Sequence, residues 1–451
     1  MRRHLIVGRY GPLDRAQVAA ATDEVVTQLD LIPSRRRLGH GIGQAIEDLR
    51  KLRVLPTEVG LDLLITAAHV HAADTRISRA SESQDTWTRE IRLVVPVSDP
   101  VGWNDAAPLL TRMLDFLTGD RWSVSFRPRP DRFARILPRR LSGRRGTSFD
   151  GVSLFSGGLD SLIDAINMLE AGRTPLLISH AGDGAASSAQ NTLMEELRSQ
   201  YRHREFDRLR AWMSFGQDLV KGVGSEDTTR GRSFLFFALG IFSGTGLGAE
   251  FNLCVPENGL IALNVPLDPL RLGALSTRTT HPFYIARWVE LLTALGIPAR
   301  IENPHWNKTK GEMVAQCADI ELLRRLAPSS LSCSSPTKGR WQHRGIEHCG
   351  YCVPCLIRRA ALHSGNDETV YTLANLRGAV LDTSQAEGQQ IRSFQAAITR
   401  IRARPDLARL LIHKPGPLSD YPDRLNDYAA VYGRGMAEVE TLLAGVQTRP
   451  L

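Results

Sequence analysis

The sequence has few cysteines, few aromatic residues and no long hydrophobic run, and each scarcity excludes a class of protein. Six cysteines in 451 residues are too few for a chain built like a small secreted domain, which is held together by disulfides. Aromatic residues make up 6% of the sequence. No run approaches the roughly 18 uninterrupted apolar residues of a membrane-spanning helix. The opening stretch MRRHLIVGRYGP lacks the apolar core and small-residue cleavage site of a secretory signal. We therefore expect a cytoplasmic protein that does not enter a membrane.

The composition that is present indicates a globular chain of two or three domains. Hydrophobic residues make up 42% of the sequence, and lysine plus arginine exceed aspartate plus glutamate to give a net charge of +8. Much of the excess lies in two clusters, at 127–145 and 198–213. Such clusters can hold phosphates or an acidic partner, but a solvated face is at least as common. Nucleic-acid binding is therefore an open alternative that the sequence does not favour.

Hydrophobic periodicity divides the chain into three regions. Residues 1–126 are predicted to form an accessory α/β domain, followed by a basic linker at 127–145 that is rich in arginine and proline. The strands expected in this domain cover 4–10, 88–99 and 120–130, and the helices cover 15–29, 40–52, 60–79 and 103–119.

The second region, 146–365, alternates apolar strand patterns with helix patterns, which predicts a doubly wound parallel sheet with helices on both faces. Ligands of such sheets bind beyond the carboxyl ends of the strands. The third region, 366–451, contains helix patterns over 386–403, 406–412 and 422–446 and no recognisable chemistry, so we expect a packing or partner-docking tail. The strands expected in the second region cover 149–155, 174–180, 209–215 and a pair within 251–265, and the helices cover 161–173, 187–202 and 231–248.

One short motif, LFSGGLDSLID at 154–164, stands between the first strand of the second region and its first helix. Free backbone N–H groups and the dipole at the start of that helix favour an anion. Gly157 and Gly158 allow close backbone approach to a phosphate, and Ser156 and Ser161 offer hydroxyl donors. Asp160 is expected either to orient the loop or to hold a magnesium ion. The motif is not a Walker loop, because G-x-x-x-x-G-K-[ST] is absent.

Four of the six cysteines fall between 333 and 355. Cys333, Cys349, Cys352 and Cys355 have the spacing C-x15-C-x2-C-x2-C, and four thiolates with close pairs suit a closed tetrahedral zinc site. An iron–sulfur cluster and unligated core thiols are the alternatives. The other two cysteines stand in apolar surroundings and are expected to be core residues.

Together these motifs resemble a known family. SGGLDS is similar to the PP-loop of the ATP pyrophosphatases, which have an adenine nucleotide alpha hydrolase-like fold, and the cysteine string resembles the zinc element of the QueC family of 7-cyano-7-deazaguanine synthases. TRGRSFLFFALG at 229–240 and NPHWNKTKGEMV at 303–314 resemble two further elements of that family, although Ser233 replaces the usual asparagine. The resemblance covers about 150–363, roughly half of the chain.

The resemblance implies an enzyme that activates 7-carboxy-7-deazaguanine as an acyl adenylate and passes the acyl group to an amine. It implies ATP, Mg²⁺ and Zn²⁺ as cofactors. Asp160, Lys310 and Arg232 would be catalytic, with Lys310 facing the ATP phosphates. ATP would contact Leu154, Phe155, Ser156, Gly157, Gly158, Leu159, Asp160, Ser161 and His180.

Departures from the family concern the acceptor. The conventional synthases lack regions like 1–145 and 366–451, and their aspartate-rich substrate segment is replaced here by 257–283. These features resemble the enlarged QueC-like proteins of anti-phage operons, the QatC proteins of the Qat system above all, which implies transfer to the N-terminus of an operon-encoded partner protein. The alternatives are a conventional synthase that uses ammonia, a PP-loop enzyme that modifies tRNA, and a non-catalytic nucleotide-binding scaffold. The substrate is expected to contact Arg230, Glu257, Asn258, Asn264, Ser276, Thr277, Arg278, Thr280 and His281.

Overall fold

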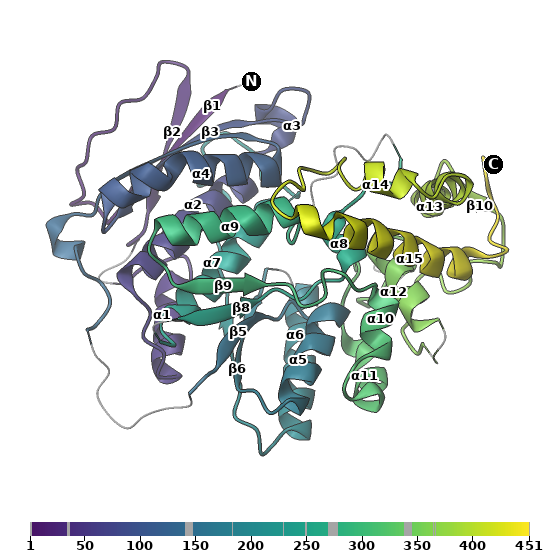
Figure 1. Cartoon of the computed structure of the whole chain (residues 1–451). Coiled ribbons are helices and arrows are strands. Elements are labelled where there is room, and N and C mark those ends of the chain that lie inside the picture. Colours follow the sequence, from purple (N-terminus) through teal and green to yellow (C-terminus); the bar gives the residue numbers. More distant parts are fainter. Residues whose placement is uncertain are drawn as a thin grey trace.

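Two parallel sheets lie on either side of a double layer of helices (Figure 1). This arrangement is seen in a computed structural model that describes residues 2–33, 37–139, 148–182, 184–228, 230–248, 250–268, 278–337, 345–363, 365 and 367–450. In the described part of the chain, no helix combines the length and the apolarity needed to cross a membrane.

The first sheet has four parallel strands in the order β2-β1-β3-β4. It confirms the expected strands at 4–10, 88–99 and 120–130 and the helices at 40–52, 60–79 and 103–119. The helix expected over 15–29 is wrong, because that segment ends in a strand whose β-branched Val25 and Val26 pair with His4 and Leu5 of β1. The elements are β1 (Arg3–Arg9), β2 (Glu24–Asp30), α1 (Ile42–Lys51), α2 (Glu58–Arg76), α3 (Arg79–Glu82), β3 (Glu90–Val97), α4 (Pro100–Thr118) and β4 (Arg121–Pro128).

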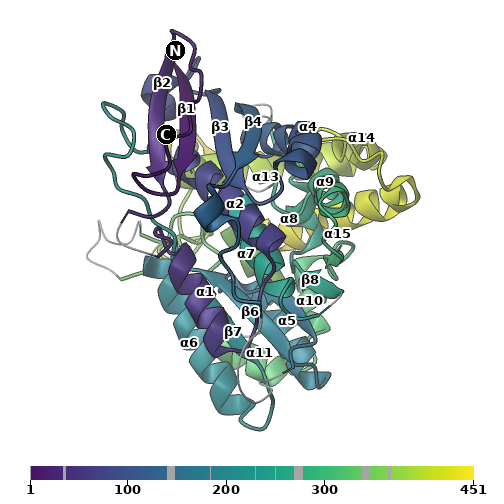
Figure 2. The ribbon, with the colours of Figure 1, turned by 90° about the vertical axis from the view of Figure 1, so that its left-hand side faces the viewer.

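The second sheet has five parallel strands in the order β7-β6-β5-β8-β9. Helices α5 and α6 belong to the apolar core on one face, and α7 and α9 belong to the core on the other. The rotated view in Figure 2 shows α5 and α6 in the lower half of the molecule, away from β1 and β2 at the top. The sheet is therefore doubly wound, as the alternating pattern predicted. Its elements are β5 (Gly151–Leu154), α5 (Leu159–Glu170), β6 (Pro175–His180), α6 (Gly184–Gln200), β7 (Asp207–Ala211), α7 (Arg232–Gly244), β8 (Phe251–Cys254), α8 (Gly259–Leu263), α9 (Pro282–Ala294) and β9 (Ala299–Glu302).

The pair of strands expected within 251–265 is half wrong. Only β8 is a strand, and it pairs with β5 and β9. The second half forms helix α8, because Asn258 caps its first turn by accepting a hydrogen bond from the Ile261 N–H at 3.1 Å. The fifth strand of the sheet is β9, which carried no clear strand pattern in the sequence.

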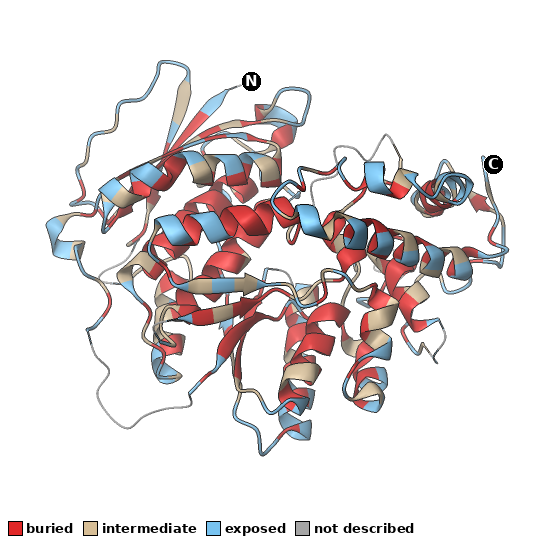
Figure 3. Cartoon of the chain, in the orientation of Figure 1, coloured by how far each residue is buried: buried red, intermediate tan, exposed pale blue. Residues whose placement is uncertain are grey.

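The two sheets share one apolar core, which runs through α2 and α7. Every residue of α2 from Gly60 to Thr75 is buried, and Figure 3 shows this buried layer between the sheets. Basic side chains at the start of the expected linker take part in this packing: Arg127 pairs with Asp14 at 2.5 Å, and Arg129 pairs with Glu58 at 2.5 Å. Residues 140–147 of that segment lie outside the described residues.

Helices α12 to α15 form a second packed unit with α8, which has its own apolar cluster, and the expected helical patterns at 386–403, 406–412 and 422–446 are confirmed. Helices α10 and α11 also belong to this part of the chain, but their apolar side chains pack with α5. The long helix α15 packs against α8, α10, α12, α13 and α14. The elements are α10 (Lys310–Ala315), α11 (Ile320–Leu326), α12 (Val353–Leu362), β10 (Leu381–Asp382), α13 (Ala386–Ala403), α14 (Leu407–Leu411), α15 (Leu425–Leu443) and β11 (Thr448–Arg449).

Candidate functional site

The SGGLDS loop lies at the point where the winding of the second sheet reverses. Strand β5 is the first strand of that sheet along the chain and stands between β6 and β8. The connections after β5 and β6, helices α5 and α6, lie on one face, whereas α7 and α9, which follow β7 and β8, lie on the other. Leu154 and Phe155 are buried at the end of β5, and the loop begins at Ser156. Open parallel sheets bind their ligands in the crevice at such a reversal.

The loop has a backbone that suits an anion. Gly157 has φ of 82°, and a Cβ there would lie 3.2 Å from the backbone nitrogen of Gln190, so a glycine is required. Gly158 caps α5, and its N–H donates to the Ser156 hydroxyl at 3.2 Å. The Ser161 hydroxyl lies 3.2 Å from the same oxygen. The loop thus places two hydroxyl groups and the positive end of a 12-residue helix together.

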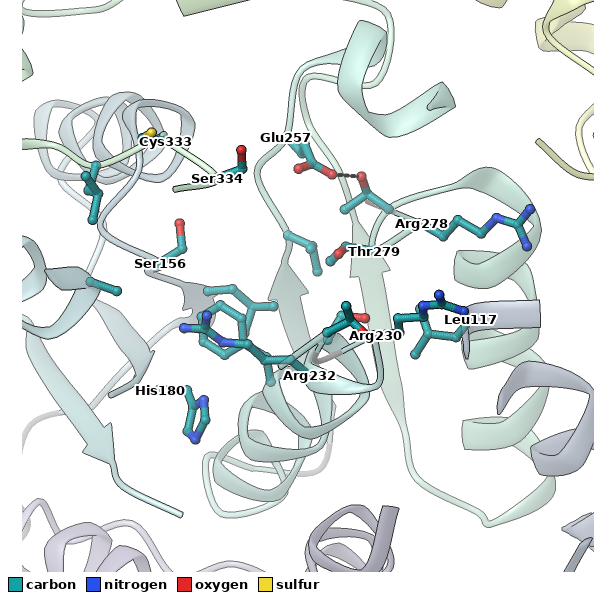
Figure 4. A pocket seen from close by; sticks show the side chains of 18 of the residues that line it. Leu117, Ser156, His180, Arg230, Arg232, Glu257, Arg278, Thr279, Cys333 and Ser334 are labelled. Atoms are coloured by element: carbon teal, nitrogen blue, oxygen red, sulfur yellow. Dashed lines mark hydrogen bonds between the residues drawn. The ribbon is translucent and has the colours of Figure 1, made fainter. Parts of the chain in front are cut away.

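A cavity of about 680 Å³ opens beside the loop (Figure 4). Its polar lining includes seven residues of the predicted site: Ser156, His180, Arg230, Arg232, Glu257, Arg278 and Thr280. Figure 4 shows Ser156 and His180 on one side and Arg230 and Arg278 on the other. A volume in this range accommodates a small organic ligand.

Asp160 and Lys310 meet, but they lie under the cavity rather than in its lining. The Lys310 ammonium donates to the Asp160 carboxylate, which also accepts from the Asn258 side chain at 2.8 Å and from the Asn258 N–H at 3.1 Å. Burial alone would raise the pKa of Asp160, but the Lys310 charge and these hydrogen bonds outweigh it and lower the pKa. Both oxygens of Asp160 are thus engaged by the chain itself, which favours the orienting role over the magnesium-binding one.

Glu257 is the carboxylate that the second sheet presents to the cavity. It follows β8 and accepts a short hydrogen bond from the Thr280 hydroxyl (Figure 4). Burial raises the pKa of Glu257 to about 7, and the nearby Asp160 carboxylate adds to this effect. The side chain is therefore able to take or release a proton near neutral pH.

Two histidines of the predicted site are held neutral. Burial lowers the pKa of both His180 and His281 to about 3. His180 ends β6 and lines the cavity, and neither of its ring nitrogens has a hydrogen-bond partner among the described residues. His281 instead caps α9, where its Nδ1 accepts from the Phe283 N–H at 3.2 Å.

Another predicted contact, Asn264, does not line this cavity. Asn264 ends α8 in the left-handed conformation, with φ of 48°, and lines a separate cavity of about 260 Å³. Ser276 and Thr277 lie outside the described residues.

The four clustered cysteines converge on one point. Their sulfur atoms all lie within 4.8 Å of one another, with 4.0 Å between Cys333 and Cys352 and 3.9 Å between Cys349 and Cys355. A tetrahedron of thiolates around zinc, with Zn–S bonds of about 2.3 Å, needs sulfur separations of about this size. Backbone N–H groups of Ser335 and Cys349 donate to the Cys333 sulfur at 3.3 Å. The donor set therefore fits a structural zinc ion.

The cysteine element touches the loop directly. The Leu331 N–H donates to the Gly157 carbonyl at 2.7 Å, and the Leu159 N–H donates to the Ser332 hydroxyl at 3.4 Å. Cys333 follows these residues and lines the cavity. The cysteine cluster thus begins at the residue directly after the segment that supports the loop.

Several supporting residues carried no sequence signal. The Gln190 amide of α6 ties the ends of β5 and β6 together by donating to the Ser156 and His180 carbonyls at 3.2 and 3.3 Å. Glu438 of α15 caps α10 by accepting from the Gly311 N–H at 3.3 Å and from the Thr309 hydroxyl. Apart from the bond between Gln190 and His180, which spans 10 residues, these contacts join segments more than 30 residues apart in the chain, so no local motif could have marked them.

Fold and site together define an α/β protein with two parallel sheets and a four-cysteine cluster that can bind zinc. Comparison with protein-family models and with curated proteins gave no match.

Proposed function

We propose that this chain is an ATP-dependent ligase that activates a carboxylate as an acyl adenylate and transfers the acyl group to an amine. The observation that carries the proposal is the position of the SGGLDS loop: it begins a helix at the reversal of a doubly wound sheet and opens on a cavity lined by three arginines. Loop amides and hydroxyl groups in that position suit the pyrophosphate of ATP.

The chemistry needs little from the protein beyond charge and position. A carboxylate oxygen attacks the α-phosphorus, the bond to the bridging oxygen of the β-phosphate breaks, and pyrophosphate leaves. An amine then attacks the acyl carbon, AMP leaves, and the nitrogen loses a proton. Loop N–H groups and arginines would stabilise the negative charge that develops on the departing groups. Mg²⁺ would arrive with ATP as a charge-neutralising ion on the phosphates.

We take 7-carboxy-7-deazaguanine as the acid and a protein N-terminus as the acceptor, on the resemblance to the QueC-like proteins of anti-phage operons. The tRNA-modifying alternative is less well supported. Such enzymes often use a catalytic or persulfide-carrying cysteine, but the four clustered cysteines converge on a metal site, and the buried Cys254 and Cys317 do not line the cavity.

The test traces an oxygen label from the acid and measures the mass of each product. The chain is incubated with Mg-ATP and 7-carboxy-7-deazaguanine labelled with ¹⁸O in its carboxylate, together with ammonia or candidate partner proteins, and every product is weighed. The proposal expects pyrophosphate, AMP that carries one ¹⁸O atom, and an amide or protein adduct. A nitrile formed from ammonia without any adduct would indicate the conventional synthase, and a lack of ATP cleavage would leave a binding role.

A matched pair of glycine variants controls for folding. Gly157→Ala is expected to reduce pyrophosphate release by about 100-fold or more, because the new methyl group meets the Gln190 backbone and misplaces the loop amides. Gly296→Ala, which also has positive φ but has no atom within 4 Å of its new Cβ, carries similar backbone strain and should leave the rate unchanged. Equal rates in the two variants would contradict a role for the loop.

A further inference from the structure

The side of the cavity opposite Ser156 in Figure 4 is built partly by the first sheet and its helices. Trp87, just before β3, and Leu117, in the last turn of α4, both line the cavity. The N-terminal unit therefore supplies a wall of the candidate site and does not merely pack beside it.

This wall holds two arginines in the same way. The Arg230 guanidinium lies 4.0 Å from the centroid of the Trp87 ring and donates to the Thr118 carbonyl at 3.1 Å. The Arg278 guanidinium lies 4.6 Å from the centroid of the Phe116 ring and donates to the Phe116 carbonyl at 2.7 Å. Both carbonyls belong to the last turn of α4, where carbonyl groups lack helix partners and the dipole is negative.

The positive charge of this pair is only weakly offset in the described part of the chain, because Asp74 and Asp120, whose charges act on Arg230, are already paired with Arg79 and Arg89. Among the described residues, no carboxylate lies within ion-pair distance of Arg230 or Arg278, although Asp227 and Glu257 also line the cavity. Burial lowers the pKa of both arginines to about 10, and Arg230 adds to the effect on Arg278. They still carry full charge at neutral pH. Two partly desolvated cations of this kind are stabilised by an anionic ligand.

We propose that Arg230 and Arg278 bind the carboxylate group of the acid substrate before its activation, and that Trp87 and the end of α4 position them. The inference rests on the proposed function and names the residues that recognise the acid. Guanidinium groups present paired N–H donors that match the two oxygens of a carboxylate. The phosphates have a separate site at the loop, which leaves this pair for the second anion in the same cavity.

The competing explanation is that the two arginines only cap α4. If the arginines only cap α4, their replacement would lower the stability of the fold but would not change which ligand binds. A choice between a charged ligand and a neutral one of the same shape therefore separates the two explanations.

The experiment uses the full chain and calorimetric titration. Mg-ATP is titrated first; 7-carboxy-7-deazaguanine and its neutral 7-carboxamide are then titrated in the presence of a non-hydrolysable ATP analogue. The unmodified chain is expected to bind the acid at least about 10-fold more tightly than the amide, because charge-assisted hydrogen bonds contribute about that much. Arg230→Gln and Arg278→Gln should each abolish this preference and leave the ATP affinity within about two-fold.

Arg112→Gln is the matched control, since Arg112 of α4 also lies over an aromatic ring, that of Phe283 at 5.0 Å, but does not line the cavity. It should keep the preference for the acid. Should a glutamine variant fail to fold, Trp87→Leu tests the same point, because it removes the ring under Arg230 and keeps the cap on α4. It should lower the affinity for the acid about three-fold or more and leave the affinity for the amide unchanged.

Each contrary outcome has a distinct meaning. Equal binding of acid and amide by the unmodified chain, or unchanged preference in both glutamine variants, overturns this inference while ATP binding still supports the ligase. Loss of ATP affinity in those variants would assign the arginines to the nucleotide and also overturns it. A chain that binds no ATP at all contradicts the proposed function itself.

Discussion

At the scale of single residues, Asp160 and Lys310 form the buried ion pair on which the candidate site rests. Asp160 lies in the first turn of α5, and Lys310 begins α10, 150 residues later. Breaking a buried pair by removing one partner leaves an uncompensated charge, which costs far more than the loss of an exposed pair. The orientation of the loop and the stability of the fold are therefore linked through these two side chains.

Lys310→Met is expected to lower the free energy of unfolding by about 3–5 kcal/mol, because the Asp160 carboxylate stays buried without its partner. Adding Asp160→Asn in the same chain should restore most of this loss. The exposed pair of Lys51 and Asp48, at 2.8 Å, offers a control, since Lys51→Met should cost less than about 1 kcal/mol. Urea unfolding measures all three, and similar losses in the Lys310 and Lys51 variants would contradict the buried pair.

Glu257 makes stability depend on pH in the direction opposite to Asp160. Its pKa is about 7 in the folded chain against an ordinary value of 4.5, so between these values the folded state binds more protons than the unfolded state. The contribution of Glu257 to the free energy of unfolding is thus complete below pH 4.5 and is lost as the pH rises through about 7.

Glu257→Gln should remove that loss. When the pH is raised from 5 to 8, the free energy of unfolding of the variant should therefore increase by roughly 2 kcal/mol relative to that of the unmodified chain. Urea unfolding at the two pH values measures the difference. Glu302→Gln, at an exposed residue of β9, should follow the unmodified chain. A Glu257 variant with the same pH dependence as the unmodified chain would show that this carboxyl has an ordinary pKa.

At the scale of elements, the cysteine element and α5 support each other through the segment that precedes Cys333. Leu331 donates to Gly157, and Ser332 accepts from Leu159, so a metal ion that fixes Cys333 also fixes the backbone that touches the loop. Ligand binding to the loop should therefore depend on the metal.

Cys352→Ser is expected to lose the metal and to weaken binding of Mg-ATP by about 10-fold, while elemental analysis of the unmodified chain finds close to one zinc ion. Cys317→Ser serves as the control, because Cys317 is a buried thiol outside the cluster, and it should keep both metal and affinity. Iron in place of zinc would show that the cysteines bind a different metal from the one expected. An unchanged ATP affinity in the metal-free variant would contradict the dependence of ATP binding on the metal.

At the scale of the whole molecule, the N-terminal unit is inseparable from the second sheet. Helix α2 is buried along almost its whole length between β3 and α7, so it depends on cover from both sheets and their helices. The Gly231 N–H donates to the Asp74 carboxylate at 2.7 Å, which ties the start of α7 to the same unit. Removal of α2 would expose the apolar surface of α7.

A fragment of residues 148–451 is accordingly expected to be insoluble or to unfold without a cooperative transition, whereas the full chain unfolds in one transition that includes both sheets. Circular dichroism during thermal unfolding distinguishes these results. A fragment with its own sharp transition would show that the shared core is dispensable.

The sequence by itself determined the features that depend on local pattern. Strand and helix periodicity predicted the doubly wound sheet, and the spacing of Cys333, Cys349, Cys352 and Cys355 predicted that their thiols converge. Glycines between a strand and a helix predicted an anion loop. All of these signals lie within a few tens of residues, where chain geometry alone relates the residues to one another.

Tertiary structure decided the rest, because the deciding contacts join distant segments. Pairing with β1 made Glu24–Asp30 a strand despite its helix-like surroundings, and capping by Asn258 made α8 a helix. Lys310, expected to face the phosphates, is paired with Asp160 under the cavity. The wall that holds Arg230 and Arg278 comes from the region that the sequence predicted to be an accessory domain. Burial and partners of this kind depend on packing across the whole chain, which no local pattern records.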